Sequence, residues 1–246
     1  AVLCLGLAAS AAAQNLGPQD YPQWRGRDRD GAAAAFTAPS TWPETLTLKW
    51  KVEVGAGYAT PLVVGSRLYA FARQGNDEVM LALDASSGRT IWRTAYAALF
   101  KMNPATKAHG EGPKSTPLFQ GGRLFTLGIS GIVSAFAASS GKVLWQRPAP
   151  PVEPLYHTAQ SPLAIGDLVV LHVGGHNDGA LTAFEAATGK ERWAWKGDGP
   201  AYGSPVVATL SGTRQIVTMT QQRAVGLDPA TGQLLWQQPF KAFADA

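Results

Sequence analysis

The stretch of sequence that decides the fold is ALDASSGRTIW, residues 82–92, because three later stretches repeat its order of residue types. They are AFAASSGKVLW at 135–145, AFEAATGKERW at 183–193 and GLDPATGQLLW at 226–236. In each copy apolar residues lead into a turn of small residues, a glycine follows, and a tryptophan stands four residues after that glycine. Hydroxyls that bond locally and a glycine that accepts a positive φ are typical of a tight turn. The pattern predicts one β-hairpin, written four times.

A second element repeats in phase with the hairpin. It is a Ser-Pro or Thr-Pro pair that opens a short apolar run, found at 60–63, 116–119, 161–164 and 204–207. Successive hairpin tryptophans lie 53, 48 and 43 residues apart. Repeats of about 40 to 50 residues with several short strands are typical of the four-stranded blades of a β-propeller. The sequence therefore predicts an all-β propeller of four-stranded antiparallel blades.

The repeats also set the expected domain organisation. We expect an irregular N-terminal lead-in at 14–45 and a partial propeller at 46–246, with blades at about 58–96, 115–147, 161–195 and 204–238. The segment LTLKWKVEV at 46–54 alternates apolar and polar residues and places Trp50 where the last strand of a blade has its tryptophan. We expect it to be a strand that completes another blade and so removes a free edge. The four blades are then a fragment of a seven- or eight-bladed ring.

The Ser/Thr-Pro start and the Gly-x-x-x-Trp finish together resemble the PQQ-like (pyrroloquinoline-quinone-like) β-propeller repeat. Bacterial quinoprotein dehydrogenases share this repeat with the lipoprotein subunit of the outer-membrane β-barrel assembly machinery. The resemblance covers roughly three quarters of the chain and implies the propeller fold. It leaves function open, because one fold carries both enzymes and scaffolds.

The repeated tryptophans and glycines are predicted to be structural. Each tryptophan is expected to pack between adjacent blades, where its large apolar area stabilises the interface. The residues predicted to dock the blades are Trp50, Trp92, Trp145, Trp193 and Trp236, with Gly88, Gly141, Gly189 and Gly232.

The first residues and the composition indicate an exported protein. Residues 1–13, AVLCLGLAASAAA, form an uncharged apolar run that ends in small residues, as a truncated signal peptide does, with cleavage expected before Gln14. Cys4, the only cysteine, lies in that run, so the mature chain is expected to have no thiol and no membrane span. A formal charge of +4 spread over 246 residues argues against nucleic acid as a partner. We expect a monomeric propeller in the periplasm or outside the cell.

The polar and aromatic residues gather in the loops that a propeller brings to one rim of its channel. These loops are the connections between blades and the turns between second and third strands. The predicted binding rim comprises Tyr58, Arg73, His109, Lys114, His157, His176 and Tyr202.

No catalytic or metal-binding constellation is predicted on this rim. His172 and His176 are four residues apart, which suits one face of a helix but not a strand that enters a turn. Ser204 belongs to the repeat and lacks the surrounding Gly-x-Ser-x-Gly elbow. The sequence therefore favours a non-catalytic scaffold that docks an envelope protein or peptide.

The alternative is a quinoprotein alcohol or sugar dehydrogenase-like oxidoreductase that binds PQQ with Ca²⁺. The resemblance implies for such enzymes an adjacent Cys-Cys disulfide, a catalytic Asp and Glu/Asn ligands. The disulfide is excluded because the mature chain has no cysteine, and the other residues have no matching run in this sequence.

Overall fold

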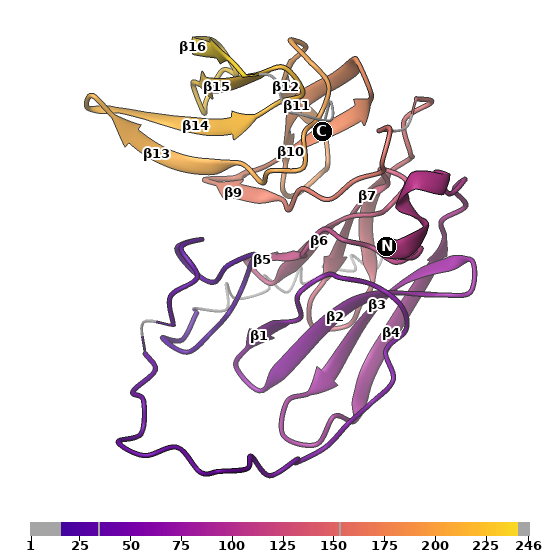
Figure 1. The fold of residues 1–246 in the computed structure, drawn as a ribbon. Coiled ribbons are helices and arrows are strands. Elements are labelled where there is room, and N and C mark those ends of the chain that lie inside the picture. Colours follow the sequence, from indigo (N-terminus) through magenta and orange to yellow (C-terminus); the bar gives the residue numbers. More distant parts are fainter. Residues whose placement is uncertain (1–15, 34, 153, 241–246) are drawn as a thin grey trace, which may run out of the picture.

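The computed structural model describes residues 16–33, 35–152 and 154–240. Their regular structure is almost entirely β (Figure 1). The first sheet contains β1 (Leu62–Val64), β2 (Arg67–Gln74), β3 (Asp77–Asp84) and β4 (Thr90–Ala97). The second contains β5 (Leu118–Gln120), β6 (Arg123–Leu127), β7 (Val133–Ala137) and β8 (Val143–Arg147). The third contains β9 (Leu163–Ile165), β10 (Leu168–Gly175), β11 (Asp178–Glu185) and β12 (Glu191–Trp195). The fourth contains β13 (Val206–Leu210), β14 (Thr213–Met219), β15 (Arg223–Leu227) and β16 (Leu234–Pro239).

Each sheet is an antiparallel meander in which neighbours in sequence are neighbours in the sheet. The sheets follow one another in chain order, as Figure 1 shows. This arrangement confirms the prediction of four-stranded propeller blades at the four repeats. One short 3₁₀-helix, η1 (Pro104–His109), lies in the connection between the first and second blades.

The hairpin that decided the fold forms as its sequence indicates. In the first blade the carboxylate of Asp84 accepts hydrogen bonds from the backbone N–H groups of Ser86 and Ser87 at 3.1 and 2.9 Å. These bonds, and those from the two hydroxyls, lower the pKa of Asp84 to about 2. The N–H of Gly88 closes the turn on the Asp84 carbonyl at 2.8 Å, with φ at +72°. The strand register shifts by one residue directly before this turn in all four blades.

Each docking tryptophan reaches the turn of the following blade. The indole N–H of Trp92 donates to the carbonyl of Ala138 at 3.1 Å, and its ring covers Gly141. A Cβ on Gly141 would lie 2.5 Å from Trp92 Cε3. The same pair of contacts joins Trp50 to Ala85 and Gly88, Trp145 to Ala186 and Gly189, and Trp193 to Pro229 and Gly232. The repeated glycine is therefore needed twice, for its positive φ and for the space under the indole.

Trp236 differs from the other four tryptophans. Its indole N–H donates to the side chain of Gln215, which lies in the same sheet. Within the described residues no turn of another blade lies over it.

The Ser/Thr-Pro pairs form a chain of hydrogen bonds across the inner strands. The N–H of Thr60 donates to Thr116 Oγ1 at 3.2 Å, and the N–H of Thr116 donates to Ser161 Oγ at 3.0 Å. The N–H of Ser161 then donates to Ser204 Oγ at 2.9 Å. The Ser or Thr hydroxyl of this motif accepts a hydrogen bond from an N–H group of the preceding blade, which would otherwise lack a partner.

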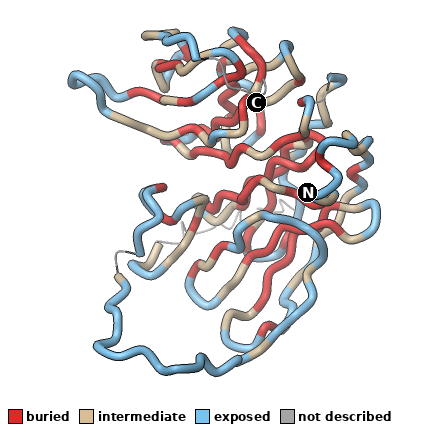
Figure 2. Tube along the Cα trace, in the orientation of Figure 1, coloured by how far each residue is buried: buried red, intermediate tan, exposed pale blue. Residues whose placement is uncertain are grey.

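Apolar packing between successive sheets supplies the core. One cluster joins Leu62 and Phe71 of the first blade to Phe119 and Phe136 of the second. Two further clusters join the second blade to the third and the third to the fourth. In Figure 2 the buried residues run along the strands inside the stack, whereas residues 36–49 are exposed or nearly so.

The segment at 46–54 was predicted to complete a blade other than the four that the structure describes. No described residue pairs with it in a strand ladder, although Trp50 docks on the first blade as the other tryptophans dock on theirs. Alternation of apolar and polar residues tells which side chains face a surface, but a strand also needs a hydrogen-bonded neighbour. The Trp50 contact is therefore present, and the strand at 46–54 stays a prediction, because the blade that it would complete is not among the described residues.

The lead-in lies along the inner strands of three blades. Tyr21 exchanges hydrogen bonds with Val63 in β1, and the carbonyl of Pro22 accepts from the N–H of Phe119 in β5. Arg29 donates to the carbonyl of Pro162 beside β9 at 2.9 Å. Its guanidinium is buried, which lowers its pKa to about 10, and it lies over the ring of Trp24.

The predicted signal peptide at 1–13, with Cys4, falls outside the described residues. Among the residues that are described, no helix has both the length and the apolar character needed to cross a membrane.

Candidate functional site

Three of the predicted rim residues meet at one cavity of about 440 Å³. They are His109, Lys114 and Tyr202, which come from two different connections between blades. The remaining lining residues are Ala105, Thr106, Tyr156 and Ala159. Three successive inter-blade connections therefore build the cavity.

The 3₁₀-helix η1 forms one wall because its ends are capped. The side chain of Asn103 accepts from the N–H of Ala105 at 2.9 Å, and Pro104 occupies the first helical position. The side-chain amide of Asn103 also donates to the carbonyl of Leu155 at 2.8 Å. Asn103 thus ties this wall to the next connection, which carries Tyr156.

Lys114 is the cation of the cavity. It is half-buried, and burial lowers its pKa below the ordinary value of 10.5. Among the described residues no carboxylate forms an ion pair with it. Glu111, in the same connection, faces Arg73 instead, with 3.9 Å between Oε2 and Nε.

Two tyrosines form the aromatic part of the lining. The rings of Tyr156 and Tyr202 have centroids 6.3 Å apart. Burial raises the pKa of Tyr202 to about 12. Its phenol therefore stays protonated in the physiological range and can donate a hydrogen bond.

Arg73 and His157 are not part of the cavity lining. The guanidinium of Arg73 lies over the ring of Phe100 at 4.8 Å and donates to the carbonyl of Ala98 at 3.0 Å. His157 is 3% exposed and packs edge-on against the same phenylalanine, with ring centroids 4.9 Å apart. Burial first, and the charge of Lys114 second, lower the pKa of His157. Both residues are engaged by neighbours within the protein.

Tyr58 and His176 also lie outside the cavity lining. The side chain of Tyr58 is 63% exposed, and its backbone N–H donates to the carbonyl of Pro113 at 2.8 Å. His176 Nε2 is 2.9 Å from the amide nitrogen of Gln221. The structure therefore divides the predicted rim into three residues that line the cavity and four that do not.

The lining includes residues that the predicted site left out. Thr106 and Ala105 come from η1, and Tyr156 from the connection before β9. The Asn-Pro pair at 103–104 is the sequence signal that could have located η1, because asparagine caps helices and proline suits the first position.

A buried carboxylate supports the connection that carries Tyr156. Glu78 accepts from the hydroxyl of Tyr96 at 2.8 Å and from the N–H of Ile129 at 2.6 Å. The loop at 128–131 in turn accepts two hydrogen bonds from Thr158. The hydroxyl of Thr158 donates to the carbonyl of Gly128, and the N–H of Thr158 donates to the carbonyl of Ile129. Burial raises the pKa of Glu78 above its ordinary value. Glu78 thus joins the first blade to the second and, through Thr158, to the cavity.

His172 provides a test of pH dependence in the third blade. It is buried, its Nε2 lies 2.9 Å from the Asp198 carbonyl, and burial lowers its pKa to about 4. The unfolded chain then binds more protons than the folded chain between that value and the ordinary 6.5, so stability falls as pH falls through this interval. We expect the free energy of unfolding to drop by about 2 kcal/mol from pH 7.5 to pH 5 through this group alone.

Urea unfolding of the protein and of the variant His172→Gln at several pH values checks this expectation. Glutamine keeps a donor for the Asp198 carbonyl but does not titrate, so the variant should lose less stability on acidification. Equal pH slopes in the two proteins would contradict the assignment to His172.

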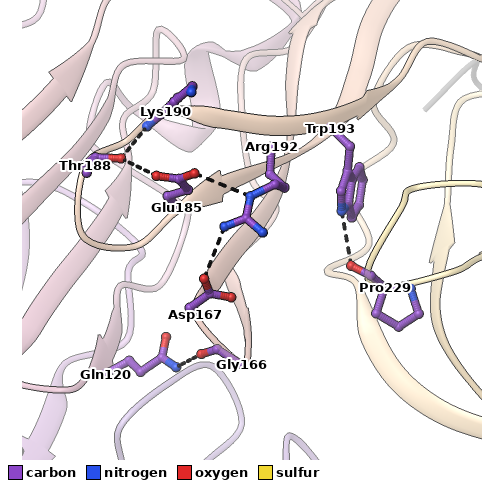
Figure 3. A network of polar contacts seen from close by, with 9 residues as sticks. All are labelled: Gln120, Gly166, Asp167, Glu185, Thr188, Lys190, Arg192, Trp193 and Pro229. Carbon is purple, nitrogen blue, oxygen red and sulfur yellow. Dashed lines mark hydrogen bonds and ion pairs between the residues drawn. The ribbon is translucent and has the colours of Figure 1, made fainter.

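The network in Figure 3 lies at the other ends of the strands. Arg192 in β12 bonds to Asp167 at 3.2 Å and to Glu185 at 3.4 Å, and all three are partly or largely exposed. These residues belong to the turns between first and second and between third and fourth strands. Antiparallel pairing places those turns away from the inter-blade connections, so Arg192 serves as a control position for the cavity.

Two curated relatives show what the chain is similar to. The outer membrane protein assembly factor BamB of Yersinia pestis is 24% identical over 210 residues, which cover 78% of this chain and 48% of the relative. The dehydrogenase subunit of the alcohol dehydrogenase (quinone) of Komagataeibacter europaeus is 28% identical over 160 residues, 60% of this chain and 21% of the relative. The chain spans less than half the length of either relative.

A solved structure agrees with the fold. The quinohemoprotein alcohol dehydrogenase from Comamonas testosteroni superposes with a TM-score of 0.64, 18% identity, and coverage of 94% of this chain and 44% of the other. At this identity the similarity concerns the fold alone. The family model described as outer membrane protein assembly factor BamB matches residues 76–245, well over half of the chain. The chain therefore belongs to the family of the outer membrane protein assembly factor BamB.

Proposed function

We propose that this protein is a non-catalytic binding and assembly scaffold of the cell envelope, which docks a partner protein at the cavity of His109, Lys114, Tyr156 and Tyr202. Membership in the BamB family supports the scaffold class. The observation that carries the proposal is the cavity itself, which combines two tyrosine rings with apolar walls. Tyrosines in such positions are typical centres of protein interfaces.

Export is part of the same proposal. A partner in the envelope requires this chain to leave the cytoplasm, and residues 1–13 have the pattern of a signal peptide. We expect the mature protein in the periplasm, beginning at Gln14. Cell fractionation with N-terminal sequencing tests this, and an uncleaved cytoplasmic protein would refute it.

The quinoprotein alternative was tested against the donor set of the cavity. A quinone with three carboxylates needs several cationic partners, and Lys114 is the cationic side chain in the lining. The guanidinium of Arg73 is already engaged by Ala98, Phe100 and Glu111. Within the described ranges no three His, Cys, Asp or Glu residues are grouped as a Ca²⁺ site would need. The cavity therefore does not fit this cofactor.

A photo-crosslinking experiment identifies the partner and tests the docking site. A benzoylphenylalanine placed at His109, an exposed position at the cavity, should form a crosslink to one envelope protein in cells. The same group placed at Arg192 is the control for the opposite ends of the strands. A crosslink of equal yield at both positions would contradict the proposed site.

The affinity for the identified partner gives the quantitative prediction. We expect Tyr202→Ala to weaken binding by about tenfold or more, because buried tyrosines in interfaces commonly contribute above 1 kcal/mol. Arg192→Ala should bind as the unchanged protein does. Calorimetric titration measures the dissociation constants, and titration with pyrroloquinoline quinone and Ca²⁺ in the same instrument tests the alternative. Tight binding of the quinone with turnover of an alcohol would overturn the scaffold proposal.

A further inference from the structure

We infer that the cavity is selective for an acidic and aromatic segment, in which a side-chain carboxylate pairs with Lys114 and a neighbouring aromatic ring packs on Tyr156 and Tyr202. This inference rests on the proposed function and specifies the chemistry of the partner at that same site.

The cavity lining contains the cationic side chain of Lys114. Lys114 is half-buried, and burial already disfavours its charged form. No described acidic residue lines the cavity with it. Two described acids of the connections around the cavity are engaged elsewhere, Glu111 beside Arg73 and Asp198 with Thr220, the N–H of Gln222 and Arg223. A carboxylate supplied by a partner would balance the charge of Lys114, which the described lining leaves without an ion pair.

The polar side chains of the lining offer a ligand mainly hydrogen-bond donors. The ammonium of Lys114 has donors only, and the Tyr202 phenol stays protonated because its pKa is raised to about 12. The hydroxyl of Thr106 donates to the carbonyl of Asn103 at 2.9 Å, so its hydrogen is used within the helix. The side chains that remain available to a ligand are therefore mainly donors. Such a site favours an anionic acceptor over a neutral amide or a cation.

The walls of the cavity include aromatic and apolar side chains. Two phenol rings, Ala105 and Ala159 leave a volume of about 440 Å³. This is within the range of about 300–1,000 Å³ typical of sites for compact organic groups. It is more than a carboxylate alone fills, and an aromatic side chain is the amino-acid group that fits stacked or tilted tyrosine rings best. The walls of the cavity therefore favour an aromatic residue next to the Glu or Asp of the partner segment.

The carboxylate is assigned to a Glu or Asp side chain rather than to a chain end. A partner that docks through its folded surface presents loops and strands, whose carboxylates are those of Glu and Asp side chains. The three connections around the cavity form an open rim, whereas a chain terminus would need a closed pocket. The experiment separates the two sources.

Blocked peptides test the selectivity directly. The probes are acetyl-Gly-Ser-Glu-Phe-Ser-Gly-amide, the same peptide with Gln in place of Glu, and the same peptide with Ala in place of Phe. We expect the Glu-Phe peptide to bind at least about tenfold more tightly than either of the others, since one charge-assisted hydrogen bond and the burial of one aromatic ring are each worth about that much. Nuclear magnetic resonance titration measures the affinities even in the millimolar range.

Variants show whether Lys114 causes the preference. In Lys114→Met, which keeps an unbranched side chain without the charge, the Glu and Gln peptides should bind equally. In Arg192→Met, at the other ends of the strands, the preference should be unchanged. A preference that survives in Lys114→Met would overturn the inference, and so would a peptide with a C-terminal Phe acid that binds more tightly than the internal Glu-Phe peptide.

The partner found by crosslinking separates failure of this inference from failure of the proposed function. If Tyr202→Ala loses the partner while Lys114→Met binds it as the unchanged protein does, the docking site stands and the acidic selectivity is wrong. If both variants bind the partner normally, the docking site itself is wrong. Thermal unfolding of each variant confirms that it is folded before its binding is compared.

Discussion

Replacement of Gly141 by alanine is expected to lower the free energy of unfolding by about 2–5 kcal/mol. Alanine at the observed φ of +73° costs about 1–2 kcal/mol in any surroundings. At Gly141 the new Cβ would also lie 2.5 Å from Trp92 Cε3 and 2.7 Å from Thr94 Oγ1. The overlap pushes the indole away from its bond to the Ala138 carbonyl, and overpacking of this kind costs about 1–3 kcal/mol more.

Gly122 offers a matched control in the same blade. Its φ is +74°, and no atom lies within 4 Å of the position a Cβ would take. Gly122→Ala should therefore show the backbone cost alone, about 1–2 kcal/mol. Chemical denaturation of both variants measures the difference. If the two glycines prove equally sensitive, the contact between the tryptophan and the next blade contributes nothing measurable.

Removal of the Glu78 side chain is expected to destabilise the protein by about 3–5 kcal/mol, because two buried donors lose their acceptor and a cavity forms. In Glu78→Ala the hydroxyl of Tyr96 and the N–H of Ile129 lose their acceptor while they remain buried. An unpaired buried donor costs about 1–3 kcal/mol, and a cavity remains where the side chain was. Because the loop at 128–131 accepts both bonds of Thr158, the variant should also weaken partner binding at the cavity.

Glu78→Gln distinguishes the hydrogen bonds from the charge. Glutamine can accept from Ile129 and donate to the Tyr96 oxygen, so most of the stability should return. The folded protein raises the pKa of Glu78 mainly by burial, so it binds more protons than the unfolded chain above the ordinary value of 4.5. The contribution of Glu78 therefore falls as pH rises through the interval between the two values. Denaturation at pH 4 and pH 7.5 should show Glu78→Gln gaining relative to the unchanged protein at the higher pH, and a loss there would contradict this.

Most of the fold could be predicted because the sequence pattern of the hairpin is short and recurs four times. The turn from Asp84 to Gly88 and the tryptophan four residues later describe a hairpin without reference to the rest of the chain. Four copies in phase then define the blade. The segment around Trp50 shows where local information ends, since its apolar alternation placed the tryptophan correctly but could not supply a strand neighbour.

The strand order predicts which loops lie near the candidate site, but it does not predict which side chains line it. The order of strands places the inter-blade connections on one rim, which is why His109, Lys114 and Tyr202 were found together. Which polar side chains turn inward depends on distant partners. Arg73 was predicted to bind a ligand, but Phe100 and Glu111 already engage it, and His157 is covered by the connection before η1. Neither contact has a sequence pattern.

The two contacts between blades point in the same direction along the chain. Four of the five docking tryptophans donate to the blade that follows, as Trp92 does to Ala138, and the N–H groups of three of the four Ser/Thr-Pro pairs do the same, as Thr116 does to Ser161. The array is thus a one-dimensional lattice with nearest-neighbour coupling, in which a repeat is stabilised by contacts with the preceding and the following repeat. Loss of one contact between two successive blades weakens the interface between those two blades and leaves the other interfaces unchanged. Cooperative opening should then begin at the weakened interface, and amide exchange would report it as a step in protection between two successive blades.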